Sequence, residues 1–213
     1  MLSPRKSKPK PKAKPKPKAK PKPKAKPKPK GRQGSPFDVV AIAASAGGLN
    51  ALTQVLSGLP DDFPVPLLVV QHVDPRHKSL MAEILDRRTG LEVIEAVDGD
   101  KIHRGTIYVA PANKHLLVAD GGRISLTQSE LVNFVRPSAN LLFSSSAAFY
   151  GKKLIAVILS GSGSDGTTAL EDIKQTGGTV IAQDEQSSEH YGMPGSAIKS
   201  GSVDFILPLD EIS

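Results

Sequence analysis

The sequence predicts an α/β fold: a mostly parallel, doubly wound sheet with helices on both faces, Rossmann-like, with an added β-hairpin. Two observations lead to this prediction. Short runs of Val, Ile, Leu and Ala alternate along the chain with segments that have helical spacing. Glycine-rich turns stand where several of these runs end. Strands that are apolar on both faces and alternate with helices are typical of a parallel sheet that is covered on both sides.

The first half of the expected domain alternates strands and helices. Apolar runs such as FDVVAIAA and PLLVVQ are typical of buried strands, and Gly58 and Pro60 mark the end of the first helix. In chain order we expect a strand at 37–44, a helix at 49–56, a strand at 66–71, a helix at 79–88, and strands at 91–96 and 106–110 around the turn Asp98-Gly99-Asp100.

The second half contains the hairpin and further alternation of helices and strands. Asp120-Gly121-Gly122 separates two short segments, so strands at 115–119 and 123–127 are expected to pair as a hairpin. After it we expect a helix at 138–150, a strand at 153–159, a helix at 167–175, a strand at 179–183, a helix at 194–199 and a last strand at 204–207.

The N-terminal segment differs in composition from the rest of the chain. Residues 1–36 hold 15 of the 28 Lys and Arg and none of the 21 Asp and Glu, so residues 37–213 carry a net charge of −8 although the whole chain carries +7. From Pro9 to Lys30 the sequence repeats P-K-P-K-A-K. Proline at alternate positions prevents helix and sheet, and dense like charge leaves nothing to bury. We therefore expect a disordered basic tail at 1–36 and one domain at 37–213.

Lysine at nearly every second position makes residues 5–32 a polycation without sequence preference. Such a segment binds nucleic acid, anionic membranes or acidic proteins with strong salt dependence. As polyproline II it would span roughly 90 Å. Three interpretations stay open: a solubilising spacer, a tether to a polyanion, and a segment that folds back on the acidic domain. No aromatic residue interrupts the lysines, so base stacking by the tail is not expected.

Composition also excludes several classes of site. The chain has no cysteine, which rules out a disulfide framework, a thiol nucleophile and a Cys-ligated zinc site. No apolar run is long enough for a membrane span, and the charged N-terminus lacks the apolar core of a secretory signal. We expect a cytoplasmic protein. The five histidines show no metal-ligand spacing, so we expect no metal and no cofactor.

Three strand ends carry residues of the kinds used in nucleophilic catalysis. Ser45, His72 and Asp165 each follow an expected buried strand, and sites in parallel sheets form outside the carboxyl ends of the strands. We expect Ser45 to act as nucleophile, His72 as general base and Asp165 as the group that orients the imidazole. Ser45 lies just before a helix, where free N–H groups and the helix dipole stabilise negative charge.

Each of these residues also has a purely structural interpretation that the sequence leaves open. Ser45 is placed like a helix N-cap, and His72 like a hydrogen-bonded histidine at a strand end. The glycines around Asp165 spell G-x-G-x-x-G, with acidic residues about 20 positions later, so dinucleotide binding is an alternative. That fingerprint alone is a weak signal. The other histidines are expected on the surface or in loops: His77, His103, His115 and His190.

Several motifs in order resemble the catalytic domain of the chemotaxis protein-glutamate methylesterases of the CheB family. They span nearly all of residues 37–213 and read VVAIAASAGGLNAL, VVQHVDP, YVAPANKHLL, VRPSANLLF, AVILSGSGSDGTTAL and VIAQDEQSSEHYGMPGSAI. The resemblance implies a doubly wound serine hydrolase that removes γ-methyl esters from glutamates of chemoreceptors, with deamidation of receptor glutamines as a second activity. It places the nucleophile at Ser45, the histidine at His72, the aspartate at Asp165 and the oxyanion N–H donors at Ala46 and Ser162.

Two departures from the family pattern bear on function. The family often has Thr after the nucleophile and Met in the glycine loop, where this chain has Ala46 and Ser162. Backbone donors survive such changes. Chemotaxis members usually carry a receiver domain that controls the esterase, whereas this chain has the basic tail, so we expect no receiver of its own. The alternative function is a binding or regulatory module with a polyanion-binding tail and little esterase activity.

Overall fold

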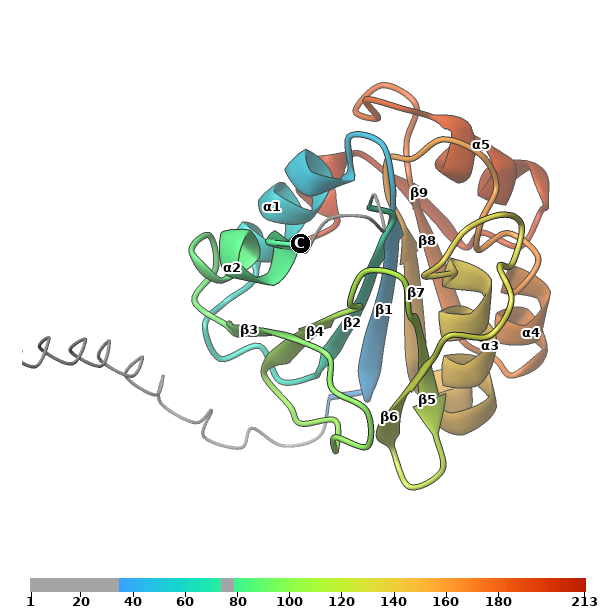
Figure 1. Cartoon of the computed structure of the whole chain (residues 1–213). Helices are drawn as coiled ribbons and strands as arrows, with labels where there is room; N and C mark the ends of the chain where they lie inside the picture. Colours follow the sequence, from blue (N-terminus) through green and yellow to red (C-terminus); the bar gives the residue numbers. More distant parts are fainter. Residues whose placement is uncertain (1–34, 74–78) are drawn as a thin grey trace, which may run out of the picture.

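The computed structural model describes residues 35–73 and 79–213, which form a central sheet between two layers of helices (Figure 1). The predictions made for the tail at 1–36 fall almost wholly outside this part of the chain, and so does the prediction for His77.

Within the described ranges the sheet has seven strands, all parallel, in the order β3-β4-β2-β1-β7-β8-β9. From β1 the chain first forms β2, β3 and β4 on one side and then crosses to β7, β8 and β9 on the other. This makes the carboxyl end of β1 a switch point of the kind at which α/β sheets place their sites. The strands are β1 (Val39–Ala44), β2 (Leu67–Gln71), β3 (Glu92–Glu95), β4 (Thr106–Val109), β7 (Leu154–Ile158), β8 (Thr179–Gln183) and β9 (Phe205–Leu207).

Side chains of β1 alternate between two hydrophobic cores, because successive residues of a strand point to opposite faces. Ala41 and Ala43 join a core covered by α3, α4 and α5, whereas Ile42 and Ala44 join one covered by α1 and α2.

None of the helices within the described residues is long and apolar enough to cross a membrane. The helices are α1 (Gly48–Gly58), α2 (Met81–Asp86), α3 (Ala139–Tyr150), α4 (Leu170–Gln175) and α5 (Gly192–Lys199), with short 3₁₀ helices at Gly151–Lys153 and Leu209–Glu211.

The hairpin forms as predicted, with β5 (His115–Ala119) antiparallel to β6 (Arg123–Thr127), outside the main sheet. The segment after β3 runs beside this hairpin, since Gly99 donates its N–H to the carbonyl of Ile124 at 2.9 Å. Strands β3 and β4 consequently pair in parallel, although a tight turn lies in the sequence between them.

The predicted fold class is confirmed, and the element boundaries differ in two informative places. Helix α4 begins at Leu170 and not at 167, because a turn precedes it in which the N–H of Thr167 bonds to the carbonyl of Ser164. Helix α5 begins at Gly192, two residues earlier than predicted, and so includes Pro194. Proline is tolerated in the first turn of a helix because its missing N–H has no partner there.

Candidate active site

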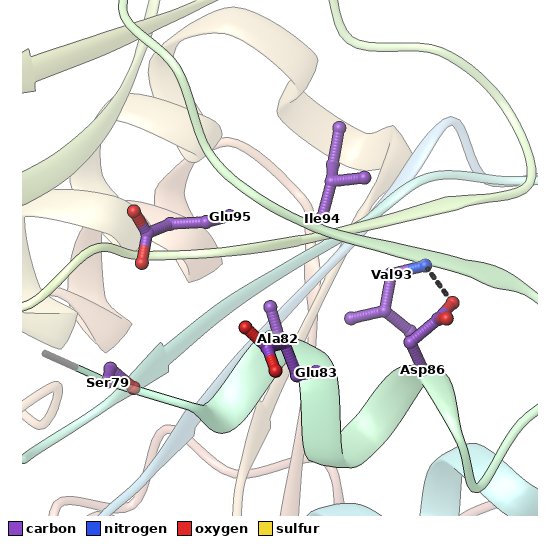
Figure 2. A pocket seen from close by; sticks show the side chains of 7 residues that line it. All are labelled: Ser79, Ala82, Glu83, Asp86, Val93, Ile94 and Glu95. Carbon is purple, nitrogen blue, oxygen red and sulfur yellow. Dashed lines mark hydrogen bonds between the residues drawn. The ribbon is translucent and has the colours of Figure 1, made fainter. Parts of the chain in front are cut away.

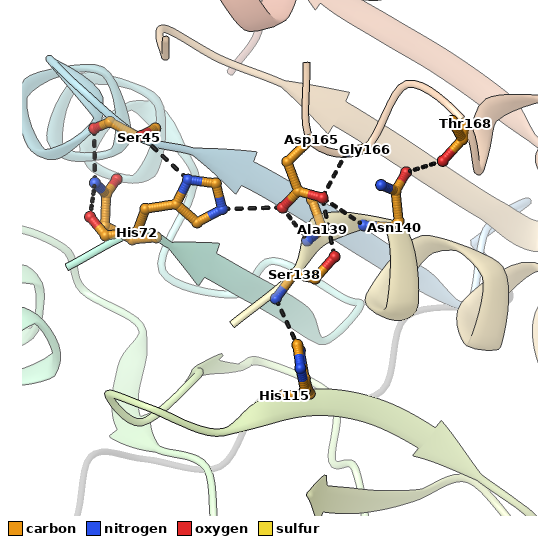
Figure 3. Close-up of polar contacts among 10 residues, drawn as sticks. Ser45, His72, His115, Ser138, Ala139, Asn140, Asp165, Gly166 and Thr168 are labelled. Carbon is orange, nitrogen blue, oxygen red and sulfur yellow. Dashed lines mark hydrogen bonds and ion pairs between the residues drawn. The ribbon is translucent and has the colours of Figure 1, made fainter. Parts of the chain in front are cut away.

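Three adjacent strands bring the predicted site residues together. Ser45 follows β1, His72 follows β2 and Asp165 lies in the loop after β7. Strand β1 pairs with β2 on one side and with β7 on the other, so these three strand ends are neighbours. Figure 3 shows the three side chains in a row, with His72 between the other two.

His72 contacts both of the other residues. Its Nδ1 lies 3.2 Å from Oγ of Ser45, and its Nε2 lies 2.9 Å from Oδ2 of Asp165. An ionised carboxylate can only accept hydrogen bonds, so Nε2 carries the proton that it donates to Asp165. Nδ1 is then left unprotonated and accepts the hydroxyl proton of Ser45. This geometry therefore favours the tautomer in which His72 faces Ser45 as a base.

Asp165 is 5% exposed, and its carboxylate accepts five hydrogen bonds (Figure 3). Three of the donors belong to the beginning of α3, so the charge also lies at the positive end of that helix. The donors are Nε2 of His72, the hydroxyl of Ser138 at 2.9 Å, and the N–H groups of Ala139 at 2.6 Å, Asn140 at 3.3 Å and Gly166 at 3.0 Å.

These contacts decide the protonation of Asp165. Burial raises the pKa of a carboxyl group, because the charged form loses its hydration. Hydrogen bonds from His72, the N–H of Ala139 and the hydroxyl of Ser138 oppose that effect and hold the pKa of Asp165 below its usual value of 3.8. Asp165 is thus a carboxylate at neutral pH, able to stabilise a cation on His72. Gly166, the last glycine of the G-x-G-x-x-G pattern, is one of the donors to this carboxylate.

The prediction for His115 is wrong: it is not a surface or loop histidine. His115 begins β5 and is fully buried, at 0% exposure. Its Nε2 lies 3.0 Å from the carbonyl of Glu130, and its Nδ1 accepts the N–H of Ser138 at 3.1 Å. It therefore fixes the residue whose hydroxyl donates to Asp165. The contact forms only because the hairpin packs against the start of α3, a long-range arrangement for which the local sequence gives no signal.

Gln71, the last residue of β2, was also missed by the sequence analysis. Its Nε2 donates to the carbonyl of Ser45 at 2.7 Å and to the carbonyl of His72 at 3.0 Å, so one side chain ties both backbones together. Its Oε1 lies against α1, where a Cβ on Gly48 would approach it to 2.2 Å. A polar residue at the end of an apolar strand is the one sequence signal that marks this position.

Ser45 does not cap α1, so the alternative interpretation of this residue as a helix N-cap is excluded. The N-cap is Gly47, in the left-handed conformation at φ 72°, and the hydroxyl of Ser45 lies beside His72 instead. A Cβ at position 47 would lie 2.8 Å from Oγ of Ser160 and 2.8 Å from Cβ of Glu189. Both the backbone angle and the lack of space require glycine at this position.

Backbone N–H groups are available beside Ser45. The glycine loop after β7 passes directly against it, because a Cβ on Gly161 would lie 3.0 Å from Cβ of Ser45. Ser160 anchors the other loop by donating its hydroxyl to the carbonyl of Ala46 at 2.9 Å. Among the residues that the structure describes, the N–H groups of Ala46 and Ser162 donate to no acceptor of the protein. Both predicted oxyanion donors are therefore unused within the described residues.

The remaining predicted loop histidines, His103 and His190, are exposed. In residues 35–73 and 79–213 no group of three His, Cys, Asp or Glu side chains is placed to hold a metal ion.

A hollow of about 290 Å³ lies apart from these residues, between α2 and β3 (Figure 2). Asp86 accepts the N–H of Val93 there at 3.3 Å and so joins the helix to the edge strand. Neither Ser45 nor His72 nor Asp165 lines the hollow, and it is not part of the candidate site. The lining residues are Ser79, Ala82, Glu83, Asp86, Val93, Ile94 and Glu95.

Comparison with known proteins identifies the family. The family model described as CheB methylesterase matches residues 40–213, which contain Ser45, His72 and Asp165. The chain belongs to the CheB methylesterase family. The crystal structure of the Thermotoga maritima CheB methylesterase catalytic domain superposes with a TM-score of 0.79 at 39% sequence identity, covering 83% of this chain and 95% of that one.

Curated relatives of the CheB family extend this match. A protein from Leptospira interrogans is 40% identical over 177 residues, which are 83% of this chain and 92% of that protein. The protein-glutamate methylesterase FrzG of Myxococcus xanthus is 41% identical over 177 residues, and the match covers 53% of its length. Protein-glutamate methylesterase/protein-glutamine glutaminase 2 of Anaeromyxobacter dehalogenans is 42% identical over 175 residues, which are 51% of its length. The chain thus spans about half the length of these last two relatives.

Asp165 should make the stability of the protein depend on acid pH. Its pKa is lower in the folded state than in the unfolded chain, so its stabilising contribution is complete above the unfolded value and is lost as pH falls through the folded one. We expect the difference in free energy of unfolding between wild type and Asp165→Asn to be largest near neutral pH and to shrink below about pH 4. Denaturant unfolding at a series of pH values measures it.

Asp120→Asn is the matched control, because Asp120 is exposed in the hairpin turn. It should change stability by no more than about 0.5 kcal/mol at any pH. A destabilisation by Asp165→Asn that is the same at pH 7 and pH 3 would contradict the assignment of a stabilised carboxylate.

Proposed function

We propose that this protein is a cytoplasmic protein-glutamate methylesterase of chemotaxis signalling, which hydrolyses γ-methyl esters of glutamates on chemoreceptors and deamidates receptor glutamines. The observation that carries the proposal is the continuous chain of contacts from Ser45 through His72 to Asp165. Membership of the CheB family and the activities named for its relatives from Myxococcus and Anaeromyxobacter support the reaction and the substrate.

The proposed reaction has two acyl-transfer steps. Oγ of Ser45 attacks the ester carbonyl while Nδ1 of His72 takes the hydroxyl proton, and Asp165 stabilises the resulting imidazolium. The tetrahedral intermediate collapses, and methanol leaves with the proton from His72. Water, deprotonated by His72, then attacks the glutamyl ester of Ser45. The bond from the acyl carbon to Oγ breaks, Oγ takes the proton back from His72, and the glutamate is released. Deamidation follows the same course, with ammonia as the leaving group.

The N–H groups of Ala46 and Ser162 are proposed to hold the oxyanion of both tetrahedral intermediates. They lie in the two loops that meet at Ser45 and donate to no other acceptor within the described residues. A donor aimed at the developing oxyanion contributes about 3–4 kcal/mol to lowering the barrier. Because backbone atoms supply both donors, the replacement of the family's usual Thr and Met side chains at these positions leaves the donors in place.

Replacing the nucleophile tests the proposed reaction. Ser45→Ala removes the attacking oxygen, so we expect methanol release from a methylated chemoreceptor to fall by about 10⁶-fold. The measurement is the release of labelled methanol from receptor carrying labelled methyl groups. Ser57→Ala is the control and should release methanol like wild type, because Ser57 lies at the far end of α1, where its exposed hydroxyl donates to the carbonyl of Gln54. Equal rates for Ser45→Ala and wild type would contradict the serine mechanism.

We further propose that residues 5–32 bind a polyanion and bring the enzyme to an anionic surface. The support is electrostatic: residues 1–36 contain 15 basic and no acidic residues, whereas residues 37–213 have a net charge of −8 and no comparable basic segment. Nucleic acid, anionic membrane and acidic protein share the chemistry that such a segment recognises.

A salt titration distinguishes polyanion binding by the tail from binding by the domain at 37–213. Binding of the full chain and of residues 37–213 is compared on double-stranded DNA, on anionic vesicles and on zwitterionic vesicles as the control. We expect the full chain to bind at least one anionic partner with an affinity that falls steeply as salt rises, and the fragment not to bind. Equal binding by the full chain and the fragment would contradict a tethering role, and the two anionic arms show which polyanion is preferred.

A further inference from the structure

A two-residue turn between β6 and α3 presents an aromatic ring to solvent. Phe134 is 95% exposed, the highest value among the large apolar side chains of the described residues, and Leu131, three residues earlier, is 54% exposed. Val132 and Val135 close the turn by exchanging backbone hydrogen bonds of 3.2 and 3.0 Å. An aromatic residue held in this way buries almost none of its surface within its own chain.

The backbone conformation of this turn makes phenylalanine an unusual residue at position 134. Asn133 and Phe134 have positive φ values of 49° and 66°. Asparagine tolerates this conformation, whereas a bulky side chain rarely adopts it, and glycine is usual at the second position of such turns. Phe134 therefore stands where folding alone favours glycine, so neither burial nor backbone preference explains the ring.

The turn is held firmly despite its exposure. Arg136, directly after it, donates from Nε and Nη2 to Oδ1 of Asn113 at 3.0 and 2.8 Å, and from Nη1 to the carbonyls of Gln128 and Ser129 at 3.1 and 2.6 Å. These bonds fix the segments on both sides of the turn. Because the backbone of the turn is already fixed, covering the ring orders only its own side-chain rotations, and this favours binding.

The turn also adjoins the proposed active site. Only three residues separate Phe134 from Ser138, whose hydroxyl donates to Asp165. Four residues of extended chain span at most about 14 Å. In Figure 1 the segment between β6 and α3 lies at the same end of the sheet as the loops that follow β1 and β7. A protein that places a side chain at Ser45 covers a patch of about 800 Å², roughly 30 Å across, which is large enough to include the turn.

We propose that Phe134, assisted by Leu131, is a docking residue that packs on an apolar surface of the protein substrate next to the esterified glutamate. It selects esters carried by a protein over small esters. The inference rests on the proposed methylesterase function, since it is the substrate of that same site that the ring contacts. Buried aromatic residues commonly dominate the binding energy of protein interfaces, and an exposed aromatic residue beside a site for a protein substrate is suited to that role.

Two substrates and three variants test the proposal in the full chain. Phe134→Gly removes the ring and suits the positive φ, so the turn should persist. Phe134→Tyr keeps an aromatic ring. Phe149→Ala, at the opposite end of α3, removes a ring that is 43% exposed and serves as the matched control. The substrates are a methylated chemoreceptor and N-acetylglutamate γ-methyl ester.

For Phe134→Gly we expect kcat/KM on the receptor to fall about 30-fold through a higher KM, the effect typical of losing one interface hot spot. On the small ester kcat/KM should stay within about twofold of wild type. Phe134→Tyr should restore most of the receptor activity, and Phe149→Ala should change neither substrate. Equal losses on both substrates, or no loss on either, would overturn the proposal.

A binding measurement separates this proposal from the proposed reaction. The affinity of Ser45→Ala for methylated receptor is compared with that of the double variant Ser45→Ala, Phe134→Gly. A weaker affinity of the double variant supports docking even if wild type releases no methanol, in which case only the esterase assignment fails. Equal affinities overturn the docking role. So does a concentration-dependent change in the apparent molecular mass of the protein in solution caused by Phe134→Gly alone, because that result assigns the ring to contact between copies of this chain.

Discussion

The carboxylate of Asp165 is the interaction on which the rest of the site depends. A charge that is 95% shielded from solvent is stable only when hydrogen bonds replace its hydration. Five donors do so here, and they come from the end of β2, the beginning of α3 and the loop after β7. The same charge therefore positions α3, orders the loop after β7 and fixes the tautomer of His72. Folding and proposed catalysis use one set of bonds.

Around this charge, polar side chains also form hydrogen bonds with backbone groups and so hold the backbone of the site in place. Gln71 joins the backbones of Ser45 and His72, and His115 positions Ser138. The three proposed catalytic residues follow adjacent parallel strands, so the pairing of these strands sets how far apart the residues lie. The segment that carries the turn at Phe134 lies at this same end of the sheet (Figure 1), where a protein substrate would have to lie.

The fold and the three central residues could be predicted because their signals are local. Apolar runs marked the strands. Ser45 and His72 each follow one directly, and Asp165 lies in the glycine-rich loop that follows another. Residues whose partners are distant in sequence could not be assigned in the same way. His115 contacts Ser138 only after the hairpin packs on α3, and its fully buried environment depends on that packing. The positive φ of Phe134 likewise follows from a turn closed by its neighbours and held by Arg136, in a sequence without the glycine that usually marks such turns.

Covalent trapping of the nucleophile tests most directly the claim that Asp165 activates Ser45 through His72. A fluorophosphonate probe, followed by intact mass and peptide mapping, should give one adduct per chain, on Ser45. In Asp165→Asn the amide favours the wrong tautomer of His72, so labelling should slow by about 10⁴-fold, with thermal unfolding at neutral pH showing that the variant is folded. Labelling of another residue, or equal rates in the folded variant and in wild type, would contradict the account.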